Sequence, residues 1–215
     1  MIDSNGIKNS LRNKNDNKAF FGISDTKDYN DNCYNDFIIN IPDDKKKLSS
    51  SNSTGRVFEI SYSKITNDYS ISVIHKQMTL YYQIESLFFF NDNKEYLFRI
   101  GKILVLFYQK EVKKEKYIEI DIQYQHKQFE SFVFRETSVP ISIGRINCLL
   151  NINHSSISKT HAVIDFSNDS KKFYFKDLKS TNGTTLIMKE DDSLRIKGEM
   201  KFKLDNIPFK LWEMP

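Results

Sequence analysis

Three short polar clusters in the second half of the chain carry residue types that bind anions. They are Gly144-Arg145, the run from Ser156 to His161 and the run from Ser180 to Thr184. Each cluster lies next to stretches with the composition of strands, and none has the composition of a core segment. Loops that gather a guanidinium, hydroxyls and backbone N–H groups predict a site for an anion.

The chemistry of the clusters suits a phosphate group. Such a phosphate carries about two negative charges and three strong acceptor oxygens at neutral pH. The planar guanidinium of Arg145 and the hydroxyl of Ser158 can satisfy these acceptors. The side chain of Asn182 offers both a donor and an acceptor, and Gly183 suits a tight turn that needs a positive φ.

Catalysis is an alternative interpretation of the same residues. Ser158 and His161 lie three residues apart, as a nucleophile and its base could. However, no Gly-x-Ser-x-Gly elbow surrounds the serine, and neither an acidic partner nor an oxyanion loop is evident. Motifs for nucleotide phosphates and zinc are absent, and Cys33 stands where a calcium loop would need glycine. We therefore expect a protein that is not an enzyme and needs no metal or cofactor.

Composition predicts an all-β protein. The 215 residues are 39% hydrophobic and include 17 Phe and 11 Tyr, enough to fill a core, whereas only 4 Pro and 7 Gly occur. The two cysteines, Cys33 and Cys148, form no paired motif, which favours a reduced intracellular compartment, nucleus or cytoplasm. Met1 to Asn17 lacks an apolar signal core, and Ile103 to Tyr108 is too short to cross a bilayer, so no membrane association is expected.

A basic nucleic-acid-binding protein is a second alternative. It is favoured by the net charge of +4 and the lysine-rich run from Lys110 to Lys116. Against it, Lys, Asp and Glu are interleaved along most of the chain, as on an ordinary solvated surface. Nucleic acid is therefore not an expected partner, and a steep dependence of binding on salt would show otherwise.

The strand predictions are short and closely spaced. The clearest is Tyr117 to Tyr124, where apolar and polar residues alternate. The others are 36–41, 57–62, 77–84, 87–90, 96–108, 129–135, 139–143, 162–166, 173–175, 194–196, 200–204 and 208–212. Such spacing is typical of a β-sandwich.

The chain is predicted to use one sandwich twice. Residues 1–32 are polar and predict a disordered arm, and Lys110 to Lys116 is predicted as a hinge between units 33–110 and 116–215. Ser70 to His75 matches Ser156 to His161, Gly55-Arg56 matches Gly144-Arg145, and further on Phe98 to Ile100 matches Phe202 to Leu204, with Tyr108 falling on Trp212. The first copy lacks a counterpart of Ser180 to Thr184.

Gly-Arg, Ser-x-x-His and Ser-Thr-Asn-Gly-Thr, in this order and between strands, resemble the forkhead-associated (FHA) domain. The segment from about Lys116 to Pro215 resembles that family over its whole length, and the first half only in part, as a degenerate copy. The resemblance implies tandem FHA-type β-sandwiches, each of two antiparallel sheets, whose loops at one end bind phosphothreonine peptides.

The resemblance also implies a role for each residue of the clusters. Arg145 would bind the phosphate, Ser158 would donate its hydroxyl, and Lys159 would offer its backbone N–H and its ammonium. Thr181 and Asn182 would come from the facing loop, with Asn182 holding the peptide backbone. Three positions would shape the loops without touching the ligand: Gly144, His161 and Gly183.

The expected function is that of a non-catalytic adaptor that reads phosphothreonine motifs on partner proteins through the second domain. The first copy keeps Arg56, Ser72 and His75 but has no counterpart of Thr181 and Asn182, so it is not expected to bind phosphothreonine. A phosphate-independent structural or scaffolding module remains the alternative. No oligomeric state follows from the sequence.

Overall fold

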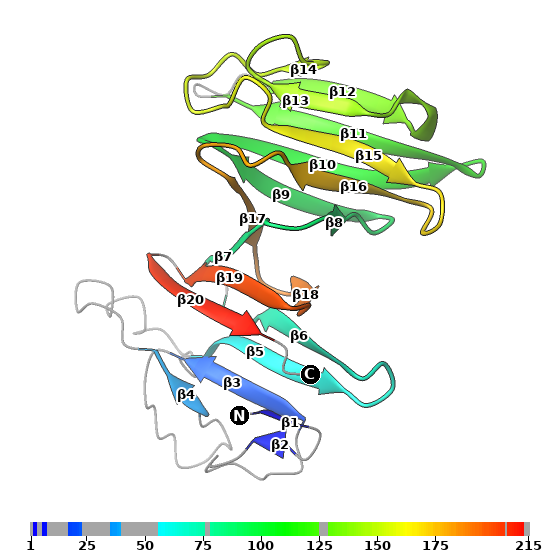
Figure 1. The fold of residues 1–215 in the computed structure, drawn as a ribbon. Coiled ribbons are helices and arrows are strands. Elements are labelled where there is room, and N and C mark those ends of the chain that lie inside the picture. Colours follow the sequence, from blue (N-terminus) through cyan, green and yellow to red (C-terminus); the bar gives the residue numbers. More distant parts are fainter. Residues whose placement is uncertain are drawn as a thin grey trace. The chain divides into compact units, whose positions relative to one another are not determined.

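The computed structural model describes residues 2–3, 6–7, 17–22, 35–39, 56–75, 78–124, 129–204 and 206–212. Over these residues the regular structure consists of β-strands and one 3-10 turn, Glu136–Ser138 (Figure 1). The predicted all-β sandwich fold is thereby confirmed. Among the same residues, no helix has the length and apolar character needed to cross a membrane.

The chain forms two compact units that differ from the predicted division. Unit 2 is continuous, Tyr82–Ile187, whereas unit 1 combines Met1–Tyr81 with Met188–Pro215. The expected hinge at 110–116 is instead the turn of a hairpin between β10 (Ile103–Val112) and β11 (Glu115–Gln123). Lys113 and Lys114 take φ values of 52° and 71°, as in the two-residue turns that suit the twist of a hairpin. The prediction of a hinge is therefore wrong.

Unit 2 is a sandwich of two sheets. In one, the strand order is β12 (Phe129–Arg135), β11, β10, β9 (Lys94–Ile100) and β17 (Thr184–Met188). In the other, it is β14 (Leu150–Asn151), β13 (Ile141–Gly144), β15 (Ala162–Ser167), β16 (Lys172–Asp177) and β8 (Phe88–Phe89). The rings of Phe98, Phe107 and Phe175 pack edge to face between the sheets, with centroids 4.8–5.9 Å apart.

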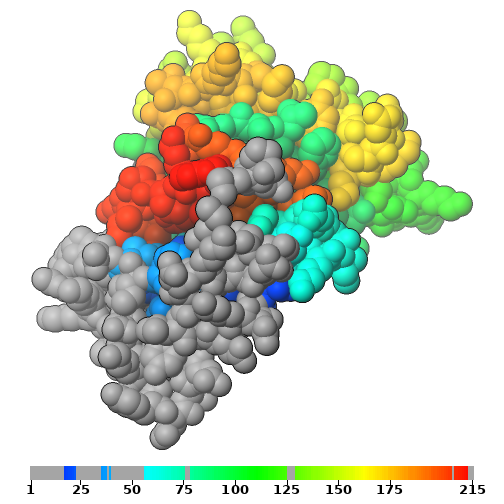
Figure 2. All heavy atoms as spheres, turned by 60° about the horizontal axis from the view of Figure 1, so that its bottom comes forward, coloured from blue at the N-terminus to red at the C-terminus, as the bar shows by residue number. Residues whose placement is uncertain are grey.

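Unit 1 has a sheet in the order β18 (Ser193–Arg195), β6 (Asp68–Val73), β5 (Arg56–Ser63), β3 (Lys18–Gly22) and β4 (Phe37–Ile38). A second group of strands has the order β7 (Leu80–Gln83), β19 (Glu199–Leu204) and β20 (Ile207–Trp212). Two short strands, β1 (Ile2–Asp3) and β2 (Gly6–Ile7), pair with each other. Phe209 of β20 stacks on Phe58 of β5 and on Phe202 of β19 in the core. Figure 2 shows β20, in red, also reaching the surface, as its alternating burial requires.

The strands of the two units correspond in register. Ile60 pairs with Ile71 in unit 1 and Ile164 pairs with Phe175 in unit 2, so that each partner lies 104 residues further along (60 to 164, 71 to 175). The turn-flanking pairs obey the same offset: Ile100 with Ile103, and Leu204 with Ile207. The predicted match of 98–100 with 202–204 has this offset.

The predicted match of Ser70–His75 with Ser156–His161 does not have it. Residues 70–73 lie in strand β6, the counterpart of β16, whereas residues 156–161 form a loop before β15. The two segments are therefore similar in sequence but are not structurally equivalent. Ser-Ile-Ser-Val alternates apolar and polar residues and extends as a strand, while Ser-Lys-Thr replaces that alternation with a polar turn.

The strands that complete each unit come from an unexpected place in the chain. By register, β9 and β10 are the counterparts of β19 and β20, and β8 occupies the edge beside β16 that β18 occupies beside β6. However, β8–β10 follow the other strands of unit 1 in sequence and complete unit 2. Conversely, β18–β20 follow the strands of unit 2 and complete unit 1.

Most predicted strands are present, with informative differences. The stretch 96–108 is divided by a turn at Gly101 and Lys102, and β6, β14 and β17 were not predicted. Residues 18–22 of the predicted disordered arm form β3, because Ala19 and Phe20 bury their side chains against β5. Most of the remaining arm lies outside the described residues.

Candidate functional site

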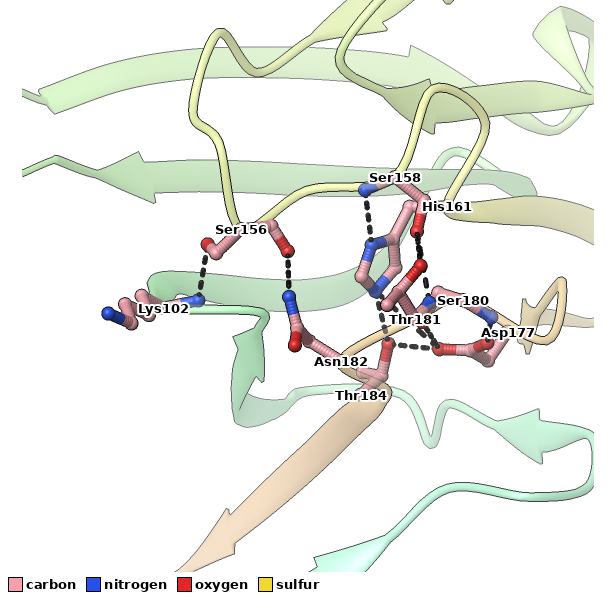
Figure 3. A network of polar contacts seen from close by, with 9 residues as sticks. All are labelled: Lys102, Ser156, Ser158, His161, Asp177, Ser180, Thr181, Asn182 and Thr184. Atoms are coloured by element: carbon pink, nitrogen blue, oxygen red, sulfur yellow. Dashed lines mark hydrogen bonds and ion pairs between the residues drawn. The ribbon is translucent and has the colours of Figure 1, made fainter.

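Three loops meet at one end of unit 2, and they carry the predicted clusters. The backbone N–H of Arg145 donates to the carbonyls of Ser158 and Lys159, at 3.0 and 3.1 Å. The N–H of Leu178, at the start of the third loop, donates to the carbonyl of His161 at 2.9 Å. The structure thus brings together all three clusters, and Figure 3 shows residues of the second and the third.

Gly144 allows the first loop to approach the second. A Cβ atom at this position would lie 2.2 Å from the carbonyl oxygen of Lys159 and 2.6 Å from the Sγ atom of Cys148. Cys148 is itself buried, and its thiol contacts the same carbonyl at 3.4 Å. Any side chain on residue 144 would therefore force the loops apart.

Arg145 carries an enclosed donor that lacks an acceptor. Its Nε atom is buried and has no hydrogen-bond partner among the described residues. A buried N–H without an acceptor costs free energy, and native structures retain few such groups. Within the described part of the chain no carboxylate forms an ion pair with this guanidinium, so its charge is available to an anion.

Ser158 and Thr181 face each other across the second and third loops. The hydroxyl oxygen of Ser158 accepts the backbone N–H of Thr181 at 3.1 Å, and the two hydroxyl oxygens are 3.5 Å apart. Ser158 is half-buried and Thr181 is exposed. The Ser158 hydroxyl oxygen therefore fixes the facing loop, and its proton is donated to the Thr181 hydroxyl in a long hydrogen bond.

The side chain of His161 lies in the protein interior beneath the loops of the site and is not exposed to solvent. Its ring is fully buried, its Nδ1 atom accepts the N–H of Ser158 at 3.2 Å, and its Nε2 atom lies 3.3 Å from the hydroxyl of Thr184. Burial lowers the pKa of His161, although the carboxylate of Asp177 at 3.6 Å acts in the opposite direction. An acceptor at Nδ1 requires the neutral tautomer with its proton on Nε2.

Asp177 organises the third loop. Its carboxylate accepts the backbone N–H of Ser180 at 2.7 Å, the Ser180 hydroxyl at 2.9 Å and the Thr184 hydroxyl at 2.7 Å. The loop then turns through Gly183 at φ +68°, a conformation that glycine adopts without strain. Asp177 and Ser180 had no assigned role in the sequence, although Asp three residues before Ser is a signal for this kind of turn.

Asn182 and Lys159 lie at the mouth of the site. The Nδ2 atom of Asn182 donates to the carbonyl of Ser156 at 2.9 Å, which leaves its Oδ1 atom and a second N–H for a ligand. The side chain of Lys159 is exposed beside these loops. Among the described residues no group of three or more potential metal ligands occurs.

The model of the FHA domain family matches residues 141–200. This range contains all eight predicted site residues. It extends past the end of unit 2 at Ile187, so that residues 188–200 of the match belong to unit 1. An FHA domain is a β-sandwich, in agreement with the fold, and the match supports a protein-interaction module that binds phosphothreonine. No curated protein and no solved structure matches the chain.

Proposed function

We propose that the loops of unit 2 bind phosphothreonine peptides and that the protein is a non-catalytic adaptor. The observation that carries this proposal is the meeting of the three loops that carry Arg145, Ser158 and Asn182. The phosphate would lie against the Arg145 guanidinium, with the Ser158 hydroxyl and the backbone and ammonium of Lys159 as further donors. Charge-assisted hydrogen bonds of this kind are about twice as strong as neutral ones.

The facing loop would hold the peptide itself. Asn182 is anchored to Ser156 through one N–H, so its remaining amide groups point to fixed positions. They can pair with one N–H and one carbonyl of an extended backbone. Thr181 would add its exposed hydroxyl. Rigid anchoring of this loop by Asp177 reduces the entropy that binding would otherwise cost.

The geometry disfavours catalysis by Ser158 and His161. Both nitrogen atoms of the buried imidazole are engaged, Nδ1 by the backbone N–H of Ser158 and Nε2 by Thr184. The Ser158 hydroxyl is directed to Thr181 and not to the imidazole. A base must contact the hydroxyl proton that it removes, so these residues do not form a nucleophile and base pair.

Unit 1 is proposed to be an FHA-like sandwich that does not bind phosphothreonine. Its strands repeat those of unit 2 at an offset of 104 residues. The guanidinium of Arg56 packs over the Phe20 ring at 3.8 Å, and the hydroxyl of Ser72 bonds to Ser193 at 3.0 Å. These residues therefore serve the sheet of β3, β5, β6 and β18. Phosphothreonine proteins of the nucleus or cytoplasm are the proposed partners.

Titration of the full chain with phosphothreonine, phosphoserine and unmodified peptide libraries tests the proposal. Arg145→Ala should weaken phosphothreonine binding by about 2 kcal/mol or more, roughly 30-fold. Arg145→Lys should restore only part of it because the planar fork is lost. Arg195→Ala is the matched control, since this arginine is exposed and pairs with Asp68 in unit 1.

Three results would contradict the proposal. Equal binding of unmodified peptides would favour a phosphate-independent scaffold. Loss of binding in Arg56→Ala but not in Arg145→Ala would move the site to unit 1. Binding of nucleic acid with a steep salt dependence, unaffected by Arg145→Ala, would favour the basic nucleic-acid-binding alternative.

A further inference from the structure

A turn from outside the family match lies against the loops that are proposed to bind the phosphopeptide. Gly101 and Lys102 connect β9 to β10, about forty residues before the first matched residue. The N–H of Lys102 donates to the hydroxyl of Ser156 at 2.9 Å, and the N–H of Gly101 is 3.4 Å from the carbonyl of Gly183. The turn therefore contacts both the second and the third loop of the site.

The close approach depends on Gly101. This residue has φ +59°, and a Cβ atom here would lie 2.4 Å from the carbonyl oxygen of Ser156 and 2.7 Å from its hydroxyl. That carbonyl also accepts the amide of Asn182, so Ser156 links the turn directly to the residue proposed to hold the peptide. Ser156 is buried and is fixed further by the Nδ1 atom of His154 at 2.7 Å.

Lys102 adds a positive charge at this edge of the site. Its side chain is exposed, and in Figure 3 it extends from the turn on the side of Ser156 and Asn182, away from Thr181 and Asp177. In the part of the chain that the structure describes, no carboxylate pairs with its ammonium. Across the site, the proposed phosphate donors are therefore followed by Asn182 and then by Lys102.

We propose that Lys102 is a specificity-determining residue, which selects an anionic side chain close to the phosphothreonine. The proposal rests on the proposed function of unit 2. An extended peptide advances about 3.4 Å per residue, so a side chain two or three positions from the phosphothreonine lies beyond Asn182. A lysine ammonium on a flexible stem can reach a carboxylate or a second phosphate there.

Oriented libraries test the proposal, with phosphothreonine fixed and three degenerate positions on each side. Full-length wild type should enrich Glu or Asp at one or two positions on one side. For single peptides, Glu at the selected position should bind roughly two- to fivefold tighter than Ala, the range of an exposed ion pair. The gain should shrink at 0.5 M salt. A phosphoserine arm at that position tells which anion is preferred.

Two variants and one control complete the experiment. Lys102→Met should keep the affinity for the Ala peptide but abolish the gain from Glu, and Lys102→Glu should shift the preference to Lys. Lys114→Glu makes the same charge change beyond the far end of β10, a ten-residue strand, and should alter nothing. A preference for Glu that survives in Lys102→Met, or no anionic preference in wild type, would overturn the inference while leaving the proposed function intact. Phosphothreonine binding unaffected by Arg145→Ala would overturn both.

Discussion

The buried imidazole of His161 accepts the backbone N–H of Ser158 at 3.2 Å, so the loop that carries the proposed phosphate donor depends on a neutral histidine. Protonation would place a second proton on Nδ1, opposite the N–H that it now accepts. The shape of the site is thereby linked to pH through a residue that the ligand does not touch.

The stability of the unligated protein should fall as the pH drops below 6.5. The pKa of His161 is lowered from 6.5 by burial, so in this range the unfolded chain binds a proton that the folded chain does not. The loss should continue as pH falls toward the lowered pKa and then level off. Urea unfolding between pH 5 and 8 measures it. The slope should be smaller in His161→Gln than in wild type, and equal slopes would show that His161 does not cause the dependence.

Asp177→Ala should both destabilise unit 2 and weaken peptide binding. The change removes the acceptor for Ser180 and leaves the fully buried hydroxyl of Thr184 without its carboxylate. Each buried polar group that loses its partner costs about 1–3 kcal/mol. Thermal unfolding and titration with a phosphothreonine peptide measure the two effects. Asp177→Asn keeps one oxygen acceptor, so its losses of stability and of peptide affinity should be smaller than those of Asp177→Ala. Unchanged peptide binding in Asp177→Ala would mean that the third loop does not need these hydrogen bonds.

Gly144→Ala should damage the site more than a glycine substitution elsewhere. Its Cβ would meet the Lys159 carbonyl at 2.2 Å, and backbone atoms cannot yield cheaply. We expect a loss of more than about 2 kcal/mol of stability, together with weaker phosphopeptide binding. Gly198→Ala is the matched control: it has φ +58° but nothing within 4 Å, so only the backbone strain of about 1 kcal/mol applies. Similar effects of the two changes would contradict the packing argument.

Local sequence patterns were sufficient to locate the loops that carry the three polar clusters and to predict most of the strands. Alternation of apolar and polar residues predicts β11 and β12 within a residue or two of their bounds. It fails for β17, whose burial does not alternate because Leu186, Ile187 and Met188 are all buried. The glycine turn at 101 was missed because the residues on both sides form one long apolar run.

The partners of the strands could not be predicted from local patterns. Hydrophobic alternation fixes which face of a strand is buried but not which strand lies beside it. The equivalence of residues 98–100 with 202–204 could be seen in the sequence. However, because the two segments are equivalent, either of them could pair with the same neighbouring strand. Likewise, the Arg145 motif was readable, whereas the contact of Lys102 with Ser156 depends on which hairpin completes the sandwich.

The exchange of strands between the two repeats is directly testable with cysteine pairs. Thr185 of β17 lies opposite Arg99 of β9, but if each repeat used its own following strands it would lie opposite Lys203, the residue 104 positions after Arg99. Directly opposed residues have Cβ atoms about 4.5–5.5 Å apart, near the range for disulfides. In a background with Cys33→Ser, the pair Thr185→Cys and Arg99→Cys should therefore cross-link on oxidation. The pair Thr185→Cys and Lys203→Cys should not. The opposite result would place β19 beside β17 and would remove Lys102 from the phosphopeptide site.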